Sequence, residues 1–316
     1  MLFLLAAVVV SGGVVSVLLW PPSYTEQRWE LTWDSVDGTF LYHSDLITSL
    51  AVAPNGDIWG GAECGMVHFD GQSWTYYSSE QINAIKSVVV ASDGRVWAGS
   101  AEGLFRLDGD AWTTVRAFRY LQDFAVAANG DVWVATSSDG LYRFDGKTWT
   151  QAYVYSATGQ DGCLSSVAVA PDGMIWAGSC YNDFRIDRFD GQETSHDFPA
   201  QGITGGFVND VVITAQGDVW VGAVGNKGSG AGFSHFDGRR WKTYTKPLEM
   251  IDNDVASIAV ERSGVAWLAT EEGVCRFDGW HCSTYLPDEI TYAVVLDAND
   301  DVWVGLNGAV ARLRKK

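Results

Sequence analysis

Positive charge, proline and cysteine are scarce in this chain of 316 residues. Lys and Arg together number 21 against 39 Asp and Glu, which gives a formal net charge of −18, and there are only 7 Pro and 5 Cys. A surface this acidic repels phosphate backbones at long range, which argues against nucleic acid as a partner. The chain is nevertheless 47% hydrophobic and contains 15 Trp, so a packed core is available and wholesale disorder is excluded.

Motifs of common enzyme chemistry are also missing. No G-x-S-x-G nucleophile motif occurs, and no expected strand is followed by the G-x-G-x-x-G of a dinucleotide site. The glycine-rich segment 222–233 lacks the spacing of a phosphate-binding loop and is interpreted as a flexible surface loop. The five histidines do not have the spacing of metal ligands: His43, His68, His196, His235 and His281. We therefore expect no catalytic residue, no metal, no cofactor and no enzymatic activity.

The first twenty residues, MLFLLAAVVVSGGVVSVLLW, contain no charged side chain. As a helix they would be about as long as the hydrocarbon core of a bilayer is thick. No Lys or Arg precedes the apolar run and no A-x-A-like site follows it, so an uncleaved anchor is favoured over a cleaved signal segment, which stays the alternative. We predict an N-terminal transmembrane helix over residues 1–20, a linker over 21–26 and a folded domain over 27–316.

One pattern recurs seven times in that domain: a short β-branched run, a small turn, and then a hydrophobic residue, Trp and two small residues. The first copy is SLAVAPNGDIWGGA from Ser49, and later copies begin at Ser87, Asp123, Ser166, Asp210, Ser257 and Tyr292. The anchor tryptophans lie 36 to 47 residues apart: Trp59, Trp97, Trp133, Trp176, Trp220, Trp267 and Trp303. A period of that length is typical of a four-stranded blade, which predicts an all-β, seven-bladed β-propeller.

Each period is expected to contain four strands. Alternation with period two predicts strands a and b as a hairpin, then a strand c that ends in Phe-Asp-Gly or a close variant, and a strand d that opens with Trp in most copies. The seventh copy stops at Leu313, after strand c, whereas residues 27–33 (QRWELTW) carry Trp29 where a strand d would have its tryptophan. We expect this N-terminal segment to complete the last blade and close the ring.

The Trp motif followed by G-L-Y-R-F-D-G-x-x-W resembles the two-component regulator propeller repeat, and the resemblance extends from about Gln27 to the C-terminus. In that family such propellers usually form the exported sensor region of bacterial membrane receptors. The resemblance therefore implies an exported, sensor-type propeller whose activity is binding.

Chain topology assigns two faces to such a ring. The a–b and c–d turns lie on one, called here the proximal face, and the b–c and d–a loops lie on the other, the distal face. A donated strand d starts on the proximal face and the last strand c ends there, so both termini emerge together. A linker of at most roughly 25 Å would then turn the proximal face to the bilayer. We expect a single-pass protein of the bacterial cytoplasmic membrane, with the propeller on its periplasmic or extracellular side.

Binding is expected on the distal face, where the loops of the fourth and fifth blades are longest. The candidate residues in these loops are Tyr181, Asn182, Asp183, Asn226 and Lys227. The b–c turns add, together with Asp183, a partial ring of polar side chains: Glu63, Glu102, Asp139, Glu272 and Asn307. Such a ring would gather a cation or a basic partner, but polar residues are common in turns and turn geometry is the favoured interpretation.

The expected partner is a protein or a glycan, or, in a related interpretation, the other subunits of a membrane complex. The alternative function is that of a propeller enzyme similar to the streptogramin lyases. No matching constellation of His and Glu is present to carry their metal-assisted chemistry.

Cysteine positions indicate the redox compartment. Cys163 lies just before strand a of the fourth blade and Cys180 just after its strand b, while Cys275 and Cys282 flank the c–d turn of the sixth blade. Opposed positions on adjacent strands have the Cα spacing that a disulfide needs. We predict both bridges, with Cys64 outside them, and two bridges fit an oxidising compartment.

Overall fold

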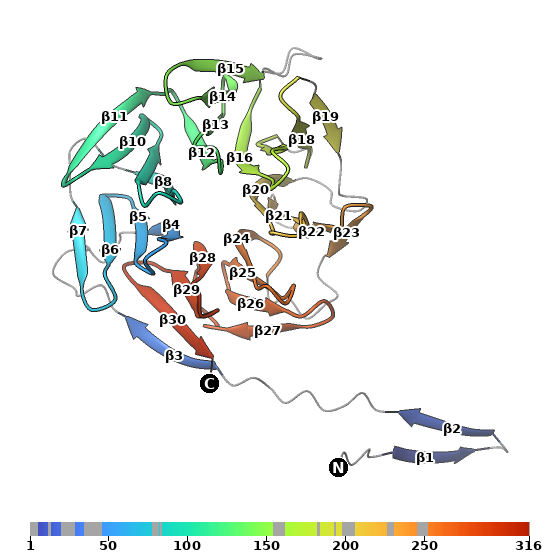
Figure 1. The fold of residues 1–316 in the computed structure, drawn as a ribbon. Coiled ribbons are helices and arrows are strands. Elements are labelled where there is room, and N and C mark those ends of the chain that lie inside the picture. The colour runs from blue at the N-terminus through green and yellow to red at the C-terminus, as the bar shows by residue number, and fades with distance from the viewer. Residues whose placement is uncertain are drawn as a thin grey trace.

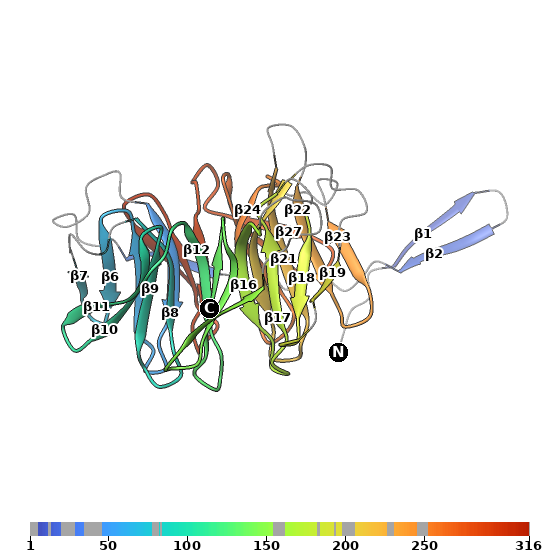
Figure 2. The ribbon, with the colours of Figure 1, turned by 90° about the horizontal axis from the view of Figure 1, so that it is seen from above.

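The computed structural model describes residues 6–11, 14–19, 29–34, 46–77, 82, 84–153, 162–181, 184–192, 194–197, 206–225, 231–244 and 252–315. From residue 46 onward, antiparallel four-stranded sheets follow one another around a central axis, and seven such sheets make up the ring (Figure 1). Figure 2 shows the ring from the side, with the connections between strands at its two faces. The prediction of an all-β, seven-bladed propeller is confirmed.

In each blade, strands a to d run in order from the axis to the rim. Blade 1 contains β4 (Ile47–Val52), β5 (Ile58–Ala62), β6 (Gly65–Phe69) and β7 (Trp74–Tyr77); blade 2, β8 (Ile85–Val90), β9 (Val96–Ser100), β10 (Gly103–Asp108) and β11 (Ala111–Ala117); blade 3, β12 (Leu121–Val126), β13 (Val132–Thr136), β14 (Gly140–Phe144) and β15 (Trp149–Tyr153). Blade 4 contains β16 (Leu164–Val169), β17 (Ile175–Ser179), β18 (Ile186–Phe189) and β19 (Thr194–Asp197); blade 5, β20 (Gly206–Ile213), β21 (Val219–Gly225), β22 (Gly232–Phe236) and β23 (Trp241–Tyr244). Blade 6 contains β24 (Val255–Val260), β25 (Ala266–Thr270), β26 (Gly273–Phe277) and β27 (Cys282–Tyr285); blade 7, β28 (Ala293–Leu296), β29 (Val302–Gly305), β30 (Val310–Lys315) and β3 (Trp29–Asp34).

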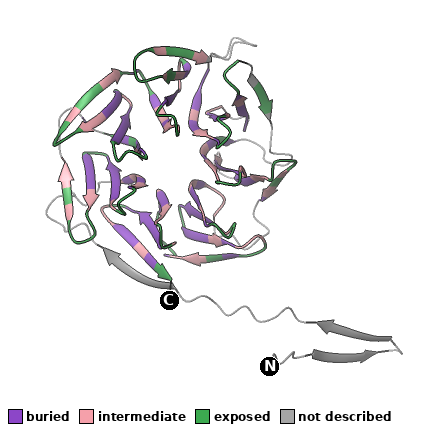
Figure 3. Cartoon of the chain, viewed as in Figure 1, coloured by how far each residue is buried: buried purple, intermediate pink, exposed green. Residues whose placement is uncertain are grey.

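The core lies between neighbouring sheets. Every residue of the b strands β5, β9, β13, β17 and β25 is buried, which Figure 3 shows as purple bands inside the ring. The small residues that follow each Trp have a steric reason: a Cβ added to Gly61 would stand 2.5 Å from Cγ2 of Ile85 in the next blade. The close approach of adjacent sheets therefore requires the small residues of the repeat motif.

The anchor Trp of each strand b carries a basic or imidazole side chain from strand c over its ring. In blade 1 the rings of Trp59 and His68 are stacked with centroids 4.0 Å apart, and in blade 7 the guanidinium carbon of Arg312 lies 4.5 Å from the ring centroid of Trp303. The other five pairs are Trp97–Arg106, Trp133–Arg143, Trp176–Arg188, Trp220–His235 and Trp267–Arg276. His68 and His235 thus occupy equivalent structural positions.

The outer position of blade 7 is occupied by a strand from the N-terminal part of the chain. The backbone of β3 runs antiparallel to β30, with Leu31 opposite Leu313 and Asp34 opposite Val310. Residues 20–28, which contain the predicted linker, lie outside the described residues, so the domain boundaries at 20 and 26 stay predictions.

The N-terminal apolar segment differs from the helix expected over residues 1–20. In the structure β1 (Ala6–Ser11) and β2 (Val14–Leu19) pair antiparallel as a two-stranded sheet of their own. Valine dominates both strands, and its branched side chain favours extended backbone, whereas a bilayer favours a helix because every backbone hydrogen bond is then internal. Among the described residues, no helix has the length and apolar character needed to cross a membrane.

Candidate binding site at the distal mouth of the axial channel

The a strands of all seven blades surround a cavity on the ring axis. Its volume is about 940 Å³, and its wall includes residues of β4, β8, β12, β16, β20, β24 and β28. Because each a strand starts at a d–a loop, the first residues of these strands form the distal mouth of the channel.

A β-bulge stands at this mouth in six of the blades. The pairing of strands a and b shifts by one residue near the start of strand a, and the extra residue of the bulge lines the cavity. A bulge re-aims one side chain out of the normal alternation of a strand. The bulge residues are Thr48, Lys86, Gln122, Ser165, Asn209 and Ala256, and Tyr292 precedes β28 at the matching point of blade 7.

Three of these side chains join their blade to the next. The Thr48 hydroxyl donates to the carbonyl oxygen of Ile85 at 2.6 Å, and the Ser165 hydroxyl donates to the carbonyl oxygen of Val208. The Asn209 amide donates likewise to the carbonyl oxygen of Ala256. Polar residues in blades 1, 4 and 5 therefore satisfy buried backbone acceptors of the neighbouring sheet.

The next residue along strand a forms a second ring of bonds between blades. Its side chain accepts a hydrogen bond from a backbone N–H of the following blade, as Ser49 does from Val88 at 2.9 Å and Asp210 does from Ile258 at 2.7 Å. The same bond joins Asp123 to Val167, Ser166 to Val211 and Ser257 to Val294. The sequence signal for these bonds is the Ser or Asp that opens six of the seven repeat copies, the seventh opening with Tyr292.

Two members of this second ring are carboxylates set deep in the channel wall. Asp123 and Asp210 keep part of their surface toward the channel, yet the dense ring around them desolvates both. Desolvation raises the pKa of Asp123, and it raises the pKa of Asp210 to about 7, with a further contribution from the negative charge of Asp123. Both carboxylates accept a hydrogen bond from a backbone N–H of the next blade.

Lys86 and Gln122 make up the part of the mouth formed by blades 2 and 3. The Lys86 ammonium donates to Oε1 of Gln122 at 2.8 Å. Lys86 is accessible from the channel, but the surrounding wall still lowers its pKa by desolvation. Among the described residues that line the cavity, it is the only Lys or Arg.

Large apolar side chains are exposed on the same face. Tyr120 is 55% exposed and Ile290 is 47% exposed in d–a connections, and Phe207 is 37% exposed at the start of β20, where it lines the cavity. On the proximal face, Trp280 is exposed in the c–d turn of blade 6. The distal mouth thus combines a polar inner wall with exposed apolar side chains around it.

The polar residues predicted at the b–c turns do not converge. Glu63, Glu102, Asp139, Glu272 and Asn307 are all exposed on the distal face, and of these five only Glu63 lines the cavity. In the described part of the chain, no group of three or more His, Cys, Asp or Glu side chains is placed to hold a metal ion. The reason is geometric, since a turn between the second and third strands stands away from the axis.

The loop residues predicted on blades 4 and 5 are only partly described. Tyr181 is half-buried, and its backbone N–H donates to the Ser179 hydroxyl at 3.1 Å. Asn182, Asp183, Asn226 and Lys227 lie outside the described residues.

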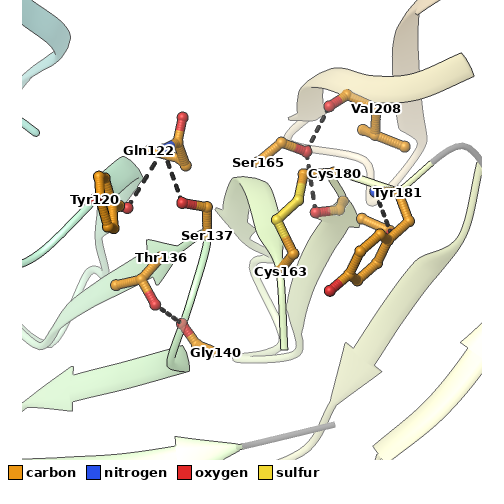
Figure 4. The surroundings of a disulfide bond; sticks show 12 residues. Tyr120, Gln122, Thr136, Ser137, Gly140, Cys163, Ser165, Cys180, Tyr181 and Val208 are labelled. Carbon is orange, nitrogen blue, oxygen red and sulfur yellow. Dashed lines mark hydrogen bonds between the residues drawn. A yellow bond between two sulfur atoms is a disulfide. The ribbon is translucent and has the colours of Figure 1, made fainter. Parts of the chain in front are cut away.

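Two cysteine pairs are bonded in the structure. Cys163 and Cys180, with Cα atoms 5.5 Å apart, join the two ends of the a–b hairpin of blade 4 next to Tyr181 (Figure 4). Cys275 and Cys282, with Cα atoms 5.4 Å apart, join strands c and d of blade 6. Cys64 is exposed and belongs to neither pair.

Fold and channel together define a seven-bladed β-propeller with an axial cavity whose wall is largely polar at its distal mouth. Compared by sequence, the chain matches no protein-family model and no curated protein. Compared by structure, it is similar to the extracellular domain of the one-component system BT4673 from B. thetaiotaomicron, with a TM-score of 0.70 and 15% identity, covering 90% of this chain and 40% of that one. The chain therefore spans about two fifths of the length of that neighbour.

Two other neighbours match over nearly their whole length. A catalytically inactive variant of virginiamycin B lyase from Staphylococcus aureus, solved with quinupristin, has a TM-score of 0.74 and 12% identity and covers 92% of this chain and 100% of its own. YCF48 bound to D1 peptide has a TM-score of 0.67 and 15% identity and covers 91% of this chain and 97% of its own. At these identities the similarity establishes the shared fold. The predicted resemblance to two-component regulator propellers is confirmed at that level by BT4673, which is also described as a hybrid two-component system.

Proposed function

We propose that this chain is a membrane-anchored, extracytoplasmic propeller that captures a protein or glycan partner on its distal face. The observation that carries the proposal is the distal mouth, where an axial cavity of about 940 Å³ opens beside the exposed side chains of Tyr120, Phe207 and Ile290. Concave sites with polar walls and exposed apolar side chains are typical binding sites. The extracellular propeller of BT4673 supports an exported role for this one.

Three features support the proposed orientation. Residues 1–20 contain no charge and are long enough to cross a bilayer as a helix. In the proposed closure of blade 7, β3 pairs with β30 and begins on the proximal face, beside the end of the last strand. Two disulfides fit an oxidising compartment outside the cytoplasmic membrane. The distal mouth then points away from the membrane.

Capture is tested by cross-linking in native membranes, with mass-spectrometric identification of the neighbours. The distal variant replaces Tyr120, Phe207 and Ile290 by Ser, and the matched control is Trp280→Ser, which removes an exposed aromatic ring from the proximal face. We expect the distal variant to lose its cross-linked partner and the control to keep it. Equal capture by both variants would overturn the placement of the site.

The same sample identifies the kind of partner. Purification in mild detergent would recover a stoichiometric protein if the propeller is an accessory subunit of a membrane complex. Loss of the cross-link after glycosidase treatment would identify a glycan. Either result identifies the kind of partner, and the comparison of the distal variant with Trp280→Ser assigns the face.

An enzyme similar to the streptogramin lyases is the second candidate function. The full-length structural match to virginiamycin B lyase is the observation that favours it. Incubation of the purified chain with a streptogramin B antibiotic, combined with metal analysis of the protein, tests this candidate. Turnover of the antibiotic would replace the binding proposal.

A further inference from the structure

The outer strand of several blades begins with a tryptophan that packs on the anchor Trp of the blade before it. The ring of Trp241 in blade 5 lies 6.2 Å from the ring of Trp176 in blade 4, at an interplanar angle of 70°. Three further pairs of this kind share a hydrophobic cluster: Trp74 with Trp303, Trp112 with Trp59, and Trp149 with Trp97. A ring at the start of strand d thus fills the boundary between two blades near the proximal face.

Blade 4 has no tryptophan at this place. Its strand β19 begins with Thr194, whose backbone lies opposite Phe189, just as the backbone of Trp241 lies opposite Phe236 in blade 5. Phe189 still contacts Trp133 of blade 3, with ring centroids 6.0 Å apart. The boundary between blades 3 and 4 therefore keeps the aromatic residue of strand c and lacks the one of strand d.

A groove lies at this same boundary. Its volume is about 740 Å³, and the a–b turns of blades 3 and 4 place it on the proximal face. The wall of the groove includes Trp133, Phe189 and Thr150. Val126 and Ile213 belong to the wall of the axial cavity as well, so the groove extends from the channel to the outer strand β15. The groove and the absent ring of strand d coincide.

Arg143 presents a fixed cation to the groove. Its Nε donates to Oδ2 of Asp131 at 2.8 Å, and its guanidinium carbon lies 5.7 Å from the ring centroid of Trp133. The side chain is nevertheless 46% exposed, against 16% for Arg312, which lies over the anchor Trp of blade 7. An exposed guanidinium whose plane is held in place is a surface on which an aromatic ring stacks.

The neighbouring boundary contains such a stack within the chain. Between blades 2 and 3, the guanidinium carbon of Arg116 lies 5.0 Å from the ring centroid of Trp149, the tryptophan that opens strand d of blade 3. The boundary between blades 3 and 4 has a cation in Arg143, while its strand d begins with Thr194. An indole ring supplied by another molecule would occupy there the place that Trp149 occupies one blade earlier.

Charge and size indicate what carries this ring. Among the described residues of the groove wall, three carboxylates face a single guanidinium: Asp131, Asp172 and Asp190 against Arg143, which is already paired with Asp131. In a chain of net charge −18, such a groove attracts basic groups and repels acidic ones. One indole fills only part of about 740 Å³, which leaves room for the residues on either side of it in a polypeptide.

We propose that the groove between blades 3 and 4 binds a polypeptide segment of a partner, in which a tryptophan is flanked by basic residues. The indole stacks on Arg143 and takes the place of the absent strand-d ring, and the flanking cations lie near Asp172 and Asp190. Because the groove is on the proximal face, this site goes beyond the proposed function and does not depend on capture at the distal mouth.

Isothermal titration of the full chain in mild detergent tests the proposal with three capped pentapeptides. The probe is Gly-Lys-Trp-Lys-Gly, whereas Gly-Lys-Ala-Lys-Gly lacks the ring and Gly-Glu-Trp-Glu-Gly reverses the charge. We expect the probe to bind and both other peptides to bind at least about tenfold more weakly, because a stacked ring or a charge match is lost. N-acetyltryptophanamide should also bind more weakly than the probe, and equal affinity would overturn the assignment to a polypeptide.

Filling the groove from within the chain assigns the binding to this place. Thr194→Trp restores the ring of the other blades, so it should weaken the probe at least about tenfold and raise the urea concentration of unfolding. The matched control is Ser195→Trp, which adds the same ring to the next residue of β19, on the other face of the sheet, and should leave binding unchanged. Thr150→Trp fills the groove from β15 and should cause the same loss even if Thr194→Trp does not fold.

A second pair of variants tests the charge. Asp172→Asn should weaken the probe about two- to fivefold at low salt, because one exposed carboxylate is lost. The control is Asp93→Asn, at the matching a–b turn of blade 2, which should change nothing. In both turns the Asp Oδ1 accepts from the backbone N–H two residues further on, a bond that Asn can also accept.

Three results overturn the proposal: no binding of the probe at millimolar concentration, equal affinity for the peptide without the ring, or full affinity in folded Thr194→Trp and Thr150→Trp. The distal variant with Ser at 120, 207 and 290 should bind the probe as the natural protein does. Failure of the groove and failure of capture at the distal mouth are therefore distinguished.

Discussion

Arg312 lies over Trp303 and at the same time reaches the carboxylate of Asp301, to which its Nη2 donates at 2.8 Å. The guanidinium also approaches Asp297 at 3.4 Å, so one cation covers an aromatic ring and neutralises two largely buried acids. The other six blades place His or Arg over the same Trp, which makes this the repeating internal contact of the ring.

Arg312→Gln should therefore destabilise the ring by about 2–4 kcal/mol, because two mostly buried carboxylates lose this guanidinium and Asp301 is left with Arg314 at 4.0 Å. Urea unfolding gives the free energy. The control is Arg240→Gln, whose ion pair with Asp237 is on the surface, and this variant should change stability by less than about 1 kcal/mol. Equal effects of the two substitutions would show that the stacked cation has no special role.

Asp210 should make the stability of the ring depend on pH. Its folded pKa of about 7 lies above the ordinary aspartate value of 3.8, so the folded state binds the proton more tightly than the unfolded state does. The contribution of this group is therefore full at acidic pH and is lost as pH rises from about 4 through about 7. Asp210→Asn keeps an oxygen that accepts from Ile258 and removes the titration.

The free energy of unfolding of Asp210→Asn should thus increase relative to that of the natural protein as pH rises across this window. Urea unfolding at pH 5, 6, 7 and 8 measures the difference, in which the titrating groups that do not interact with Asp210 cancel, whereas Asp123, whose charge raises the pKa of Asp210, contributes to it. Parallel pH profiles would contradict the raised pKa of Asp210.

The cysteine pairs predict a labelling pattern. In the folded protein without reductant, a thiol reagent should label Cys64 alone, and after reduction and unfolding it should label all 5 cysteines. Replacing Cys163 and Cys180 by Ala should cost about 2–4 kcal/mol, because a loop with a sequence separation of 17 is no longer closed in the unfolded chain. Complete labelling before reduction would refute both bridges.

The pairing of β3 with β30 predicts different effects of two truncations. A chain that starts at residue 27 keeps β3, whereas a chain that starts at residue 35 removes it and exposes the edge of β30. We expect the shorter chain to unfold at lower urea concentration and to aggregate through that edge. Identical stability of the two chains would mean that the ring does not depend on β3.

The repeat made the fold predictable from the sequence. Trp59 and its six counterparts mark strand b because a ring that packs between sheets and two small residues that admit the next sheet are needed in every blade. The N-terminal segment was different, since a run of valines suits a strand or a membrane helix and only its surroundings decide between them.

The candidate site was less predictable, for two physical reasons. The direction of Lys86 and Gln122 depends on a one-residue bulge, and residue types alone do not show where a register shifts. Glu102 and Asp139 stand in turns away from the axis, so a shared position in the repeat did not bring them together. Only the three-dimensional structure shows which of the recurring residues face the channel.

Site-specific photo-cross-linking tests the distal mouth most directly. A photoreactive amino acid placed at position 120 reports on the distal face, and the same group at position 280 reports on the proximal face. In native membranes, we predict a discrete cross-linked partner from position 120 and none from position 280. A partner that cross-links from position 280 alone would contradict capture at the distal mouth.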